Sequence, residues 1–215
     1  MKGVSFDNIH SFKDLNLILA PFTPTPAEPQ TNFLKVPGRD GSLDLTDANG
    51  ETKYNSREFQ FTFTIAPGDS LTFDERVSKV SSALNGVKCK IILDRDPDYY
   101  WYGRCKVDNY AQNKKLGQVV VKATVNPYKL KKEETVARVE LTSNEQTVAL
   151  KNGRLAAIPT IDCSKTGVIV TFDGDTYTLA YGKNRILGIR FIEGYNTLKL
   201  SGTGEVVFTW QEGEL

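Results

Sequence analysis

The stretch that decides the fold is Ile192–Trp210, which reads IEGYNTLKLSGTGEVVFTW. Apolar and polar residues alternate on both sides of Gly202-Thr203-Gly204, and this period of two is typical of a β-strand with one buried face. On the second strand Val206, Phe208 and Trp210 share a face. The stretch therefore predicts an antiparallel hairpin whose apolar face lies in a core.

Similar short strands fill the sequence before this hairpin. The predicted strands cover residues 135–141, 146–150, 158–162, 168–172, 176–181, 186–192, 197–200 and 206–210. Turn signals such as Asn152-Gly153 and Asp173-Gly174 separate them. This spacing predicts an antiparallel β-sandwich. The run Lys129–Glu134 is charged and lacks periodicity, so we place a domain boundary there and assign residues 131–215 to the sandwich.

The first domain, residues 1–130, is predicted to combine strands with one helix. Glu58–Ile65 alternates strictly, with three phenylalanines on one face. Val4–Phe6, residues 15–19 and Val119–Val125 also read as strands. A Thr-x-x-Glu capping box at Thr72 and Glu75 begins a helix with apolar residues at helical spacing. Asn85-Gly86 supplies its end, and we expect the helix to pack on the sheet.

A hairpin follows the helix, with its turn at residues 94–98. If the turn is centred near Pro97, Cys89 lies opposite Cys105 on an apolar face, and we expect both to be reduced thiols. The other face carries Lys88, Lys90, Arg104 and Lys106. Two interpretations of these like charges remain open: a solvated face, or a contact surface for a neighbouring subunit that supplies acidic groups.

A proline-rich segment lies near the N-terminus. Pro21, Pro24, Pro26 and Pro29 exclude a helix and a central strand. The segment is either a mobile loop or an extended arm that lies on a neighbouring molecule. Further along, Pro37-Gly38-Arg39-Asp40-Gly41 reads as a turn between strands, with glycines at positions of positive φ.

Composition restricts the function classes. The net charge of +1 gives no global reason to expect nucleic acid or an anionic membrane as partner. No apolar run has the length of a membrane-spanning helix. The three cysteines lack zinc spacing, and His10, the only histidine, is placed in a polar turn without a catalytic partner nearby in sequence. Asp94, Asp96 and Asp98 alternate like calcium ligands, but the glycine and glutamate that such a loop needs are missing. We predict no catalytic residue, cofactor or metal.

Three motifs, in order along the chain, carry a resemblance to a known family. They are Val36–Thr46 followed by Tyr54 and Arg57, the segment Asn126-Pro127-Tyr128-Lys129, and the closing hairpin. Together they make the chain similar to siphophage distal tail proteins, the baseplate component that caps the tail tube. In that family the first of these motifs marks the start of the sheet of the ring-forming domain.

The resemblance implies a mainly β protein in which residues 1–130 form a ring-forming domain and residues 131–215 a galectin-like sandwich. It implies a homo-hexamer in a phage or prophage baseplate that joins the tail tube protein to the tail-tip hub protein and to peripheral receptor-binding proteins. Its site would be the virion tail tip after assembly in the host cytoplasm, without sequence-specific nucleic acid binding or membrane insertion. The role would be structural and not enzymatic. Because extended segments clasp adjacent protomers in this family, the resemblance favours the arm interpretation of the prolines.

The alternative class is a carbohydrate-binding β-sandwich adhesion module. It would require an exposed aromatic platform in the second domain, for which Tyr177, Tyr181, Tyr195 and Trp210 are the candidates. No spacing among these four demands exposure.

Overall fold

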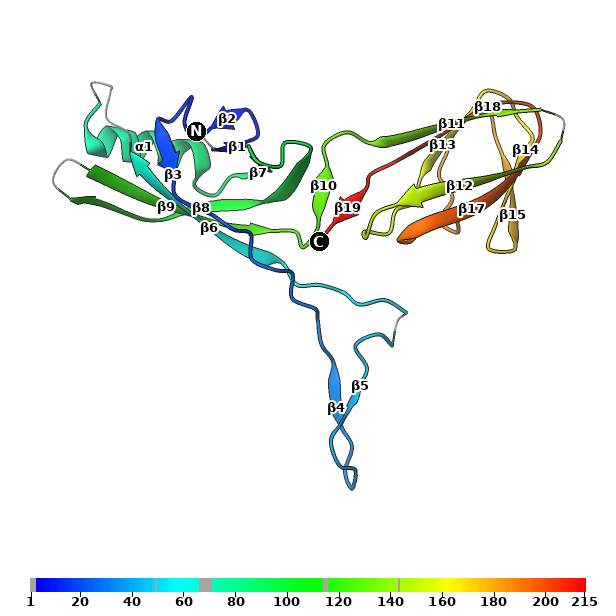
Figure 1. Cartoon of the computed structure of the whole chain (residues 1–215), viewed down its shortest axis with the longest axis horizontal. Helices are drawn as coiled ribbons and strands as arrows, with labels where there is room; N and C mark the ends of the chain where they lie inside the picture. Colours follow the sequence, from blue (N-terminus) through cyan, green and yellow to red (C-terminus); the bar gives the residue numbers. More distant parts are fainter. Residues whose placement is uncertain (1–2, 49, 66–70, 114–115, 143) are drawn as a thin grey trace. The chain divides into compact units, whose positions relative to one another are not determined.

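The computed structural model describes residues 3–48, 50–65, 71–113, 116–142 and 144–215 (Figure 1). The chain divides into two compact units, one ending at Lys129 and the other spanning Leu130–Glu214. This division falls within the charged run from Lys129 to Glu134. Nearly all regular structure is antiparallel strand, so the predicted mainly β class is confirmed.

The first unit is built on one antiparallel sheet in the order β2-β1-β7-β8-β9-β6-β3. Its strands are β1 (Val4–Phe6), β2 (Ile9–His10), β3 (Leu17–Leu19), β6 (Arg57–Ile65), β7 (Lys88–Leu93), β8 (Tyr99–Asn113) and β9 (Leu116–Val125). Phe59, Phe61 and Phe63 of β6 are fully buried on one face, as their alternation predicts. That face is the core side of the sheet, so the opposite face of the central strands is open to partners.

Helix α1 (Phe73–Leu84) covers the core face against β8 and β9. The predicted capping box is confirmed: the Thr72 hydroxyl accepts the Glu75 N–H, and the Glu75 carboxylate accepts the Thr72 N–H at 2.8 Å. Val77, Val80 and Leu84 are its buried residues. The helix ends at Asn85 because Gly86 adopts a φ of +79°, which favours glycine.

The predicted register of the β7–β8 hairpin is wrong by two residues. Cys89 lies opposite Gly103, and Ile91 lies opposite Trp101. The reason is the turn, whose backbone bonds join Asp96 N–H to Leu93 C=O and Tyr99 N–H to Asp96 C=O, and so centre it on Asp96. A shift of two keeps every side chain on its predicted face, so the basic face and the apolar face are unchanged.

Cys89 and Cys105 are therefore diagonal neighbours, with sulfurs 3.7 Å apart in a hydrogen bond. This bond lowers the pKa of Cys89, and together with burial it raises the pKa of Cys105. Burial also raises the pKa of Cys163 to about 11. All three are buried free thiols in the structure.

We expect the three cysteines to remain thiols in freshly purified protein. Cys105 and Cys163 stay protonated at neutral pH because their pKa values are raised, and a thiol is a far weaker nucleophile than a thiolate. Peptide mapping without reductant should recover all three cysteines unpaired. A stoichiometric bridge between Cys89 and Cys105 would contradict this expectation.

The second unit is a β-sandwich of two four-stranded antiparallel sheets. One has the order β11 (Thr135–Leu141), β18 (Gly204–Trp210), β13 (Thr160–Cys163), β16 (Gly182–Asn184). The other has the order β12 (Gln146–Asn152), β17 (Gly194–Ser201), β14 (Val168–Phe172), β15 (Asp175–Leu179). Beside them β10 (Lys129–Lys131) pairs with β19 (Gly213–Glu214). Val206, Phe208 and Trp210 are buried between the sheets, as the closing hairpin predicts.

One predicted strand of the sandwich is wrong. Residues 186–190 form no strand, and Phe191 makes only an isolated bridge with Ala157. A turn bond from Ile189 N–H to Ile186 C=O bends the chain there instead. The edge strand of this sheet is β16, which lies just before that segment.

Candidate functional site

The most exposed part of the first unit is a long hairpin, residues 28–55, which we call the hairpin arm (Figure 1). It holds β4 (Phe33–Lys35) and β5 (Ser42–Asp44), which form a two-stranded sheet of their own. Gly38 and Gly41 in the turn have φ of +78° and +76°, so the predicted turn is confirmed. The expectation that this motif starts the main sheet is wrong, because its strands pair only with each other.

The hairpin arm exposes apolar side chains on both of its faces. Phe33 is 57% exposed and Leu34 is 51% exposed. Neighbouring residues of a strand point to opposite faces, so the two side chains lie on opposite sides of the ribbon. A two-stranded hairpin is marginally stable alone in water. The arm therefore has the properties of a segment that becomes covered on both faces.

The base of the hairpin arm is anchored in its own chain. Pro29 bridges to Tyr54, and the Gln30 N–H donates to the Lys53 carbonyl. Arg57, at the start of β6, is only 7% exposed. Its Nε donates to the Thr25 carbonyl at 2.6 Å, and one terminal nitrogen donates to the Pro127 carbonyl at 3.1 Å.

The guanidinium of Arg57 lies over aromatic rings. It is 5.4 Å from the ring centroid of Phe59 and 5.8 Å from that of Trp101. Desolvation lowers the pKa of Arg57 from its ordinary value, which is high enough that the side chain stays charged. A planar cation with fixed donors thus orients the two segments that meet at the base of the arm.

The proline-rich segment lies along β6 of its own chain. The ring of Phe22 packs on Phe61 at a centroid distance of 4.5 Å, and the Thr25 hydroxyl donates to the Glu58 carbonyl. The expectation that the segment obtains its contacts from another chain is therefore wrong, because these contacts hold it in place already. Of its prolines, Pro21, Pro26 and Pro29 are exposed and Pro24 is half-buried. The segment leads into the hairpin arm, which is the longer exposed extension.

The four predicted basic residues lie together on the outer face of the sheet. Lys88 and Lys90 of β7 and Arg104 and Lys106 of β8 are all exposed, and we call them the basic strip. Arg104 donates to the Gly86 carbonyl, and Lys106 is 3.8 Å from Asp108. The structure thus places all four on one surface, whereas the prolines belong to the segment along β6.

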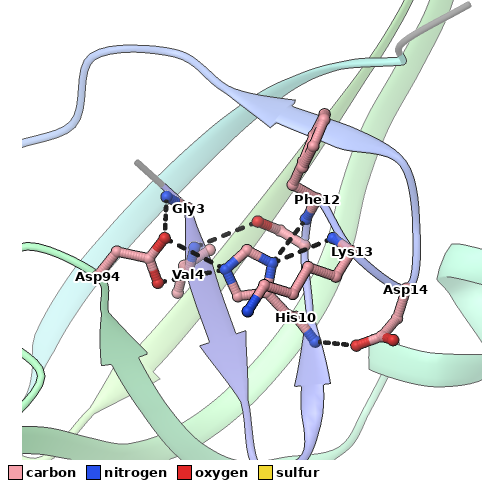
Figure 2. A network of polar contacts seen from close by, with 8 residues as sticks. Gly3, Val4, His10, Phe12, Lys13, Asp14 and Asp94 are labelled. Carbon is pink, nitrogen blue, oxygen red and sulfur yellow. Dashed lines mark hydrogen bonds and ion pairs between the residues drawn. The ribbon is translucent and has the colours of Figure 1, made fainter. Parts of the chain in front are cut away.

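Sequence reasoning missed the polar network around His10 (Figure 2). Nδ1 of His10 accepts the N–H groups of Phe12 and Lys13 at 3.1 Å, so Nε2 carries the ring hydrogen and donates to Asp94 at 3.2 Å. Asp94 also accepts the Gly3 N–H at 2.7 Å. The placement of His10 in a solvated turn is therefore wrong. Its partner lies 84 residues away, and no local signal identifies it.

The acidic turn acts through ion pairs and not as a calcium loop. Asp96 pairs with Lys129 at 2.9 Å, and Asp94 is committed to His10 and Gly3. Within the described ranges, no group of three or more metal-ligating side chains gathers. Also within them, no helix has the length and apolar character to cross a membrane.

Replacing Asp94 by alanine should destabilise the first unit. The change leaves the Gly3 N–H and the His10 Nε2–H without their acceptor, which costs about 1–3 kcal/mol for half-buried donors. Urea unfolding should show this loss in the first transition. Asp98→Ala in the same turn is the control, because Asp98 is exposed and has no hydrogen bond, and its effect should stay within about 0.5 kcal/mol. Equal losses for both variants would remove the role assigned to the network.

Two comparisons place the chain among known proteins. A family model described as the phage tail protein RIFT-related domain matches residues 9–142. The crystal structure of Dit (gp 19.1) of phage SPP1, described as a paradigm of the hub adsorption apparatus of phages that infect Gram-positive bacteria, has the same fold. It matches with a TM-score of 0.69 and 15% identity over 100% of both chains. No curated protein matches.

The SPP1 Dit match spans both units, so the RIFT-related domain and the galectin-like sandwich predicted by resemblance are both present. The family match covers more than half of the chain, including the hairpin arm and the basic strip. The chain therefore belongs to the siphophage tail protein family with the RIFT-related domain, and its fold is that of a distal tail protein.

Proposed function

We propose that six copies of this chain form a ring at the tip of a siphophage or prophage tail. The ring would join the tail tube protein to the tail-tip hub protein and leave the second unit free to hold peripheral host-recognition proteins. Shape is its mechanism: an open lumen with separate surfaces above and below. We place assembly in the host cytoplasm and the finished ring in the virion.

The observation that carries this proposal is the hairpin arm. Its apolar residues Phe33, Leu34 and Val36 are 57%, 51% and 37% exposed in a single chain. Exposed apolar groups on a projecting ribbon indicate a protein interface. A neighbouring copy of the chain supplies the cover in a closed ring, where every arm meets an equivalent surface.

A mass measurement in solution tests the proposal. Light scattering on the eluting protein should give six times the chain mass of 23.9 kDa, and negative-stain images should show six-fold rings. A monomer at every concentration and in the presence of tail tube protein would contradict it.

We propose a structural role and not an enzymatic one. His10 has both ring nitrogens engaged, in the network with Asp94 and two backbone N–H groups. Its geometry therefore serves to hold the strand that begins at Val4.

The alternative of a carbohydrate-binding module has weak support in the sandwich. Trp210 is buried, and Tyr177 is half-buried. Tyr181 and Tyr195 are 75% and 74% exposed, but Tyr195 belongs to β17 and Tyr181 precedes β16 of the other sheet. A hollow of about 430 Å³ over β11, β18 and β13 is lined by charged and hydroxyl side chains with only Val207 apolar.

We therefore expect no glycan binding at micromolar concentration by the second unit. A sugar platform needs an exposed aromatic face beside polar groups, and the hollow lacks one. A glycan array probed with residues 130–215 should remain blank. Micromolar binding that Tyr181→Ala or Tyr195→Ala abolishes would place the adhesion function first.

A further inference from the structure

The outer face of the first sheet concentrates positive charge. The basic strip (Lys88, Lys90, Arg104 and Lys106) continues onto Lys122 of β9, which lies opposite Lys106. Asp108 is the one carboxylate bonded to these cations in the described part of the sheet, at 2.9 Å from Lys122. The hydrogen bond from Lys122 holds the pKa of Asp108 below its ordinary value, so Asp108 is ionised and committed to that lysine. The strip therefore keeps a strong excess of charge in a chain whose net charge is +1.

Two lysines of the strip are held over tyrosine rings. Lys90 Nζ is 4.7 Å from the ring centroid of Tyr100, and Lys88 Nζ is 4.9 Å from that of Tyr102. These cation–π contacts restrict long side chains that would otherwise be free, which lowers the entropy lost when a partner binds. They also cover the rings, so that Tyr100 is only 8% exposed.

A groove runs along the strip. It has a volume of about 580 Å³. Its basic walls are Lys88, Arg104 and Lys106, and Ser56, Asn85, Thr124 and Asn126 add neutral hydrogen-bonding groups. Amide and hydroxyl groups of this kind suit the N–H and C=O groups of a polypeptide backbone.

The spacing of the cations matches an extended polypeptide. Lys88 and Lys90, and likewise Arg104 and Lys106, are two residues apart on one strand, a repeat of about 6.6–6.8 Å. Lys88 lies directly opposite Arg104, which is unfavourable without an anion between them. A partner strand with carboxylates at alternate positions has the same repeat and relieves that repulsion.

We propose that the basic strip binds an extended acidic segment of another protein, with Asp or Glu at alternate positions. A nucleic acid fits less well, because single strands bind by stacking bases on open aromatic faces, whereas here lysines cover Tyr100 and Tyr102. The proposal concerns partner chemistry and stands whether or not the chain forms a ring.

Fluorescence anisotropy at low salt tests the proposal with the full chain. The probe is a labelled ten-residue peptide of alternating Glu and Thr, compared with a peptide of the same composition in which the glutamates are contiguous. We expect the alternating peptide to bind at least tenfold more tightly and to lose affinity as salt rises. The double variant Lys88→Gln/Arg104→Gln should lose at least tenfold.

The matched control is Lys151→Gln/Lys199→Gln, which removes two exposed lysines of the second unit and should bind as the parent does. Thermal unfolding should be unchanged in both variants because all four side chains are exposed. Equal binding of the two peptides, or equal loss in the control, would overturn the proposal. Tighter binding of a single-stranded oligonucleotide of the same charge would assign the strip to nucleic acid instead.

Discussion

Replacing residues 32–51 by a two-residue Asn-Gly turn should convert the proposed ring into a monomer. The change keeps the base of the hairpin arm, where Pro29 bridges to Tyr54 and Gln30 bonds to Lys53, and closes it with a favoured hairpin turn. None of the described residues removed is buried, so thermal unfolding of the first unit should hardly change. Light scattering on the eluting protein should show the loss of assembly.

The magnitude follows from the apolar residues of the arm. Phe33, Leu34 and Val36 retain roughly half of their exposed surface, so covering all three contributes about 2–4 kcal/mol per contact. That corresponds to an association about 30-fold to 700-fold weaker without them. Tyr181→Ser/Leu187→Ser removes two more exposed side chains from the second unit and should leave assembly intact. An unaltered oligomer after loss of the arm would return residues 28–55 to the status of a surface loop.

Separating the units should separate their roles. Residues 1–129 should still assemble, and residues 130–215 should be a folded monomer. The second unit encloses its own core, with Ile161, Leu198 and Phe208 fully buried, so it needs no neighbour to fold. The hairpin arm and the basic strip both lie in the first unit.

The structure moves the cut by one residue from the predicted boundary. Lys131 N–H donates to the Glu212 carbonyl, so β10 belongs with β19 and the sandwich. Thermal unfolding and light scattering on each half check the prediction. If residues 130–215 assemble while residues 1–129 stay monomeric, oligomerisation belongs to the sandwich instead.

Elements with a local pattern were predictable from the sequence. The alternation in Glu58–Ile65, the capping box at Thr72 and the closing hairpin each state their structure within about ten residues, and the structure contains all three. The β7–β8 register was not predictable in this way. It depends on which residue of the turn makes the backbone bonds, and the sequence offered Pro97 where the structure uses Asp96.

The site was predictable in its charge but not in its shape. Alternation alone placed Lys88, Lys90, Arg104 and Lys106 on one face. The strands of the hairpin arm are only three residues long and have no core to impose a pattern, so only their turn was recognised. His10 and Asp94 meet across 84 residues, and the pairing of β1 with β7 brings them together.

Arg57 gives the first unit a mechanical property. Through two carbonyl oxygens its guanidinium links residue 25, on the way into the hairpin arm, with residue 127, on the way out of β9. Tension on the arm is therefore delivered to the exit of the sheet through one rigid side chain, in parallel with the hydrogen-bond ladder between β6 and β9. In a tail tip that must withstand the pull of a virion on its host, Arg57 is a tie-rod.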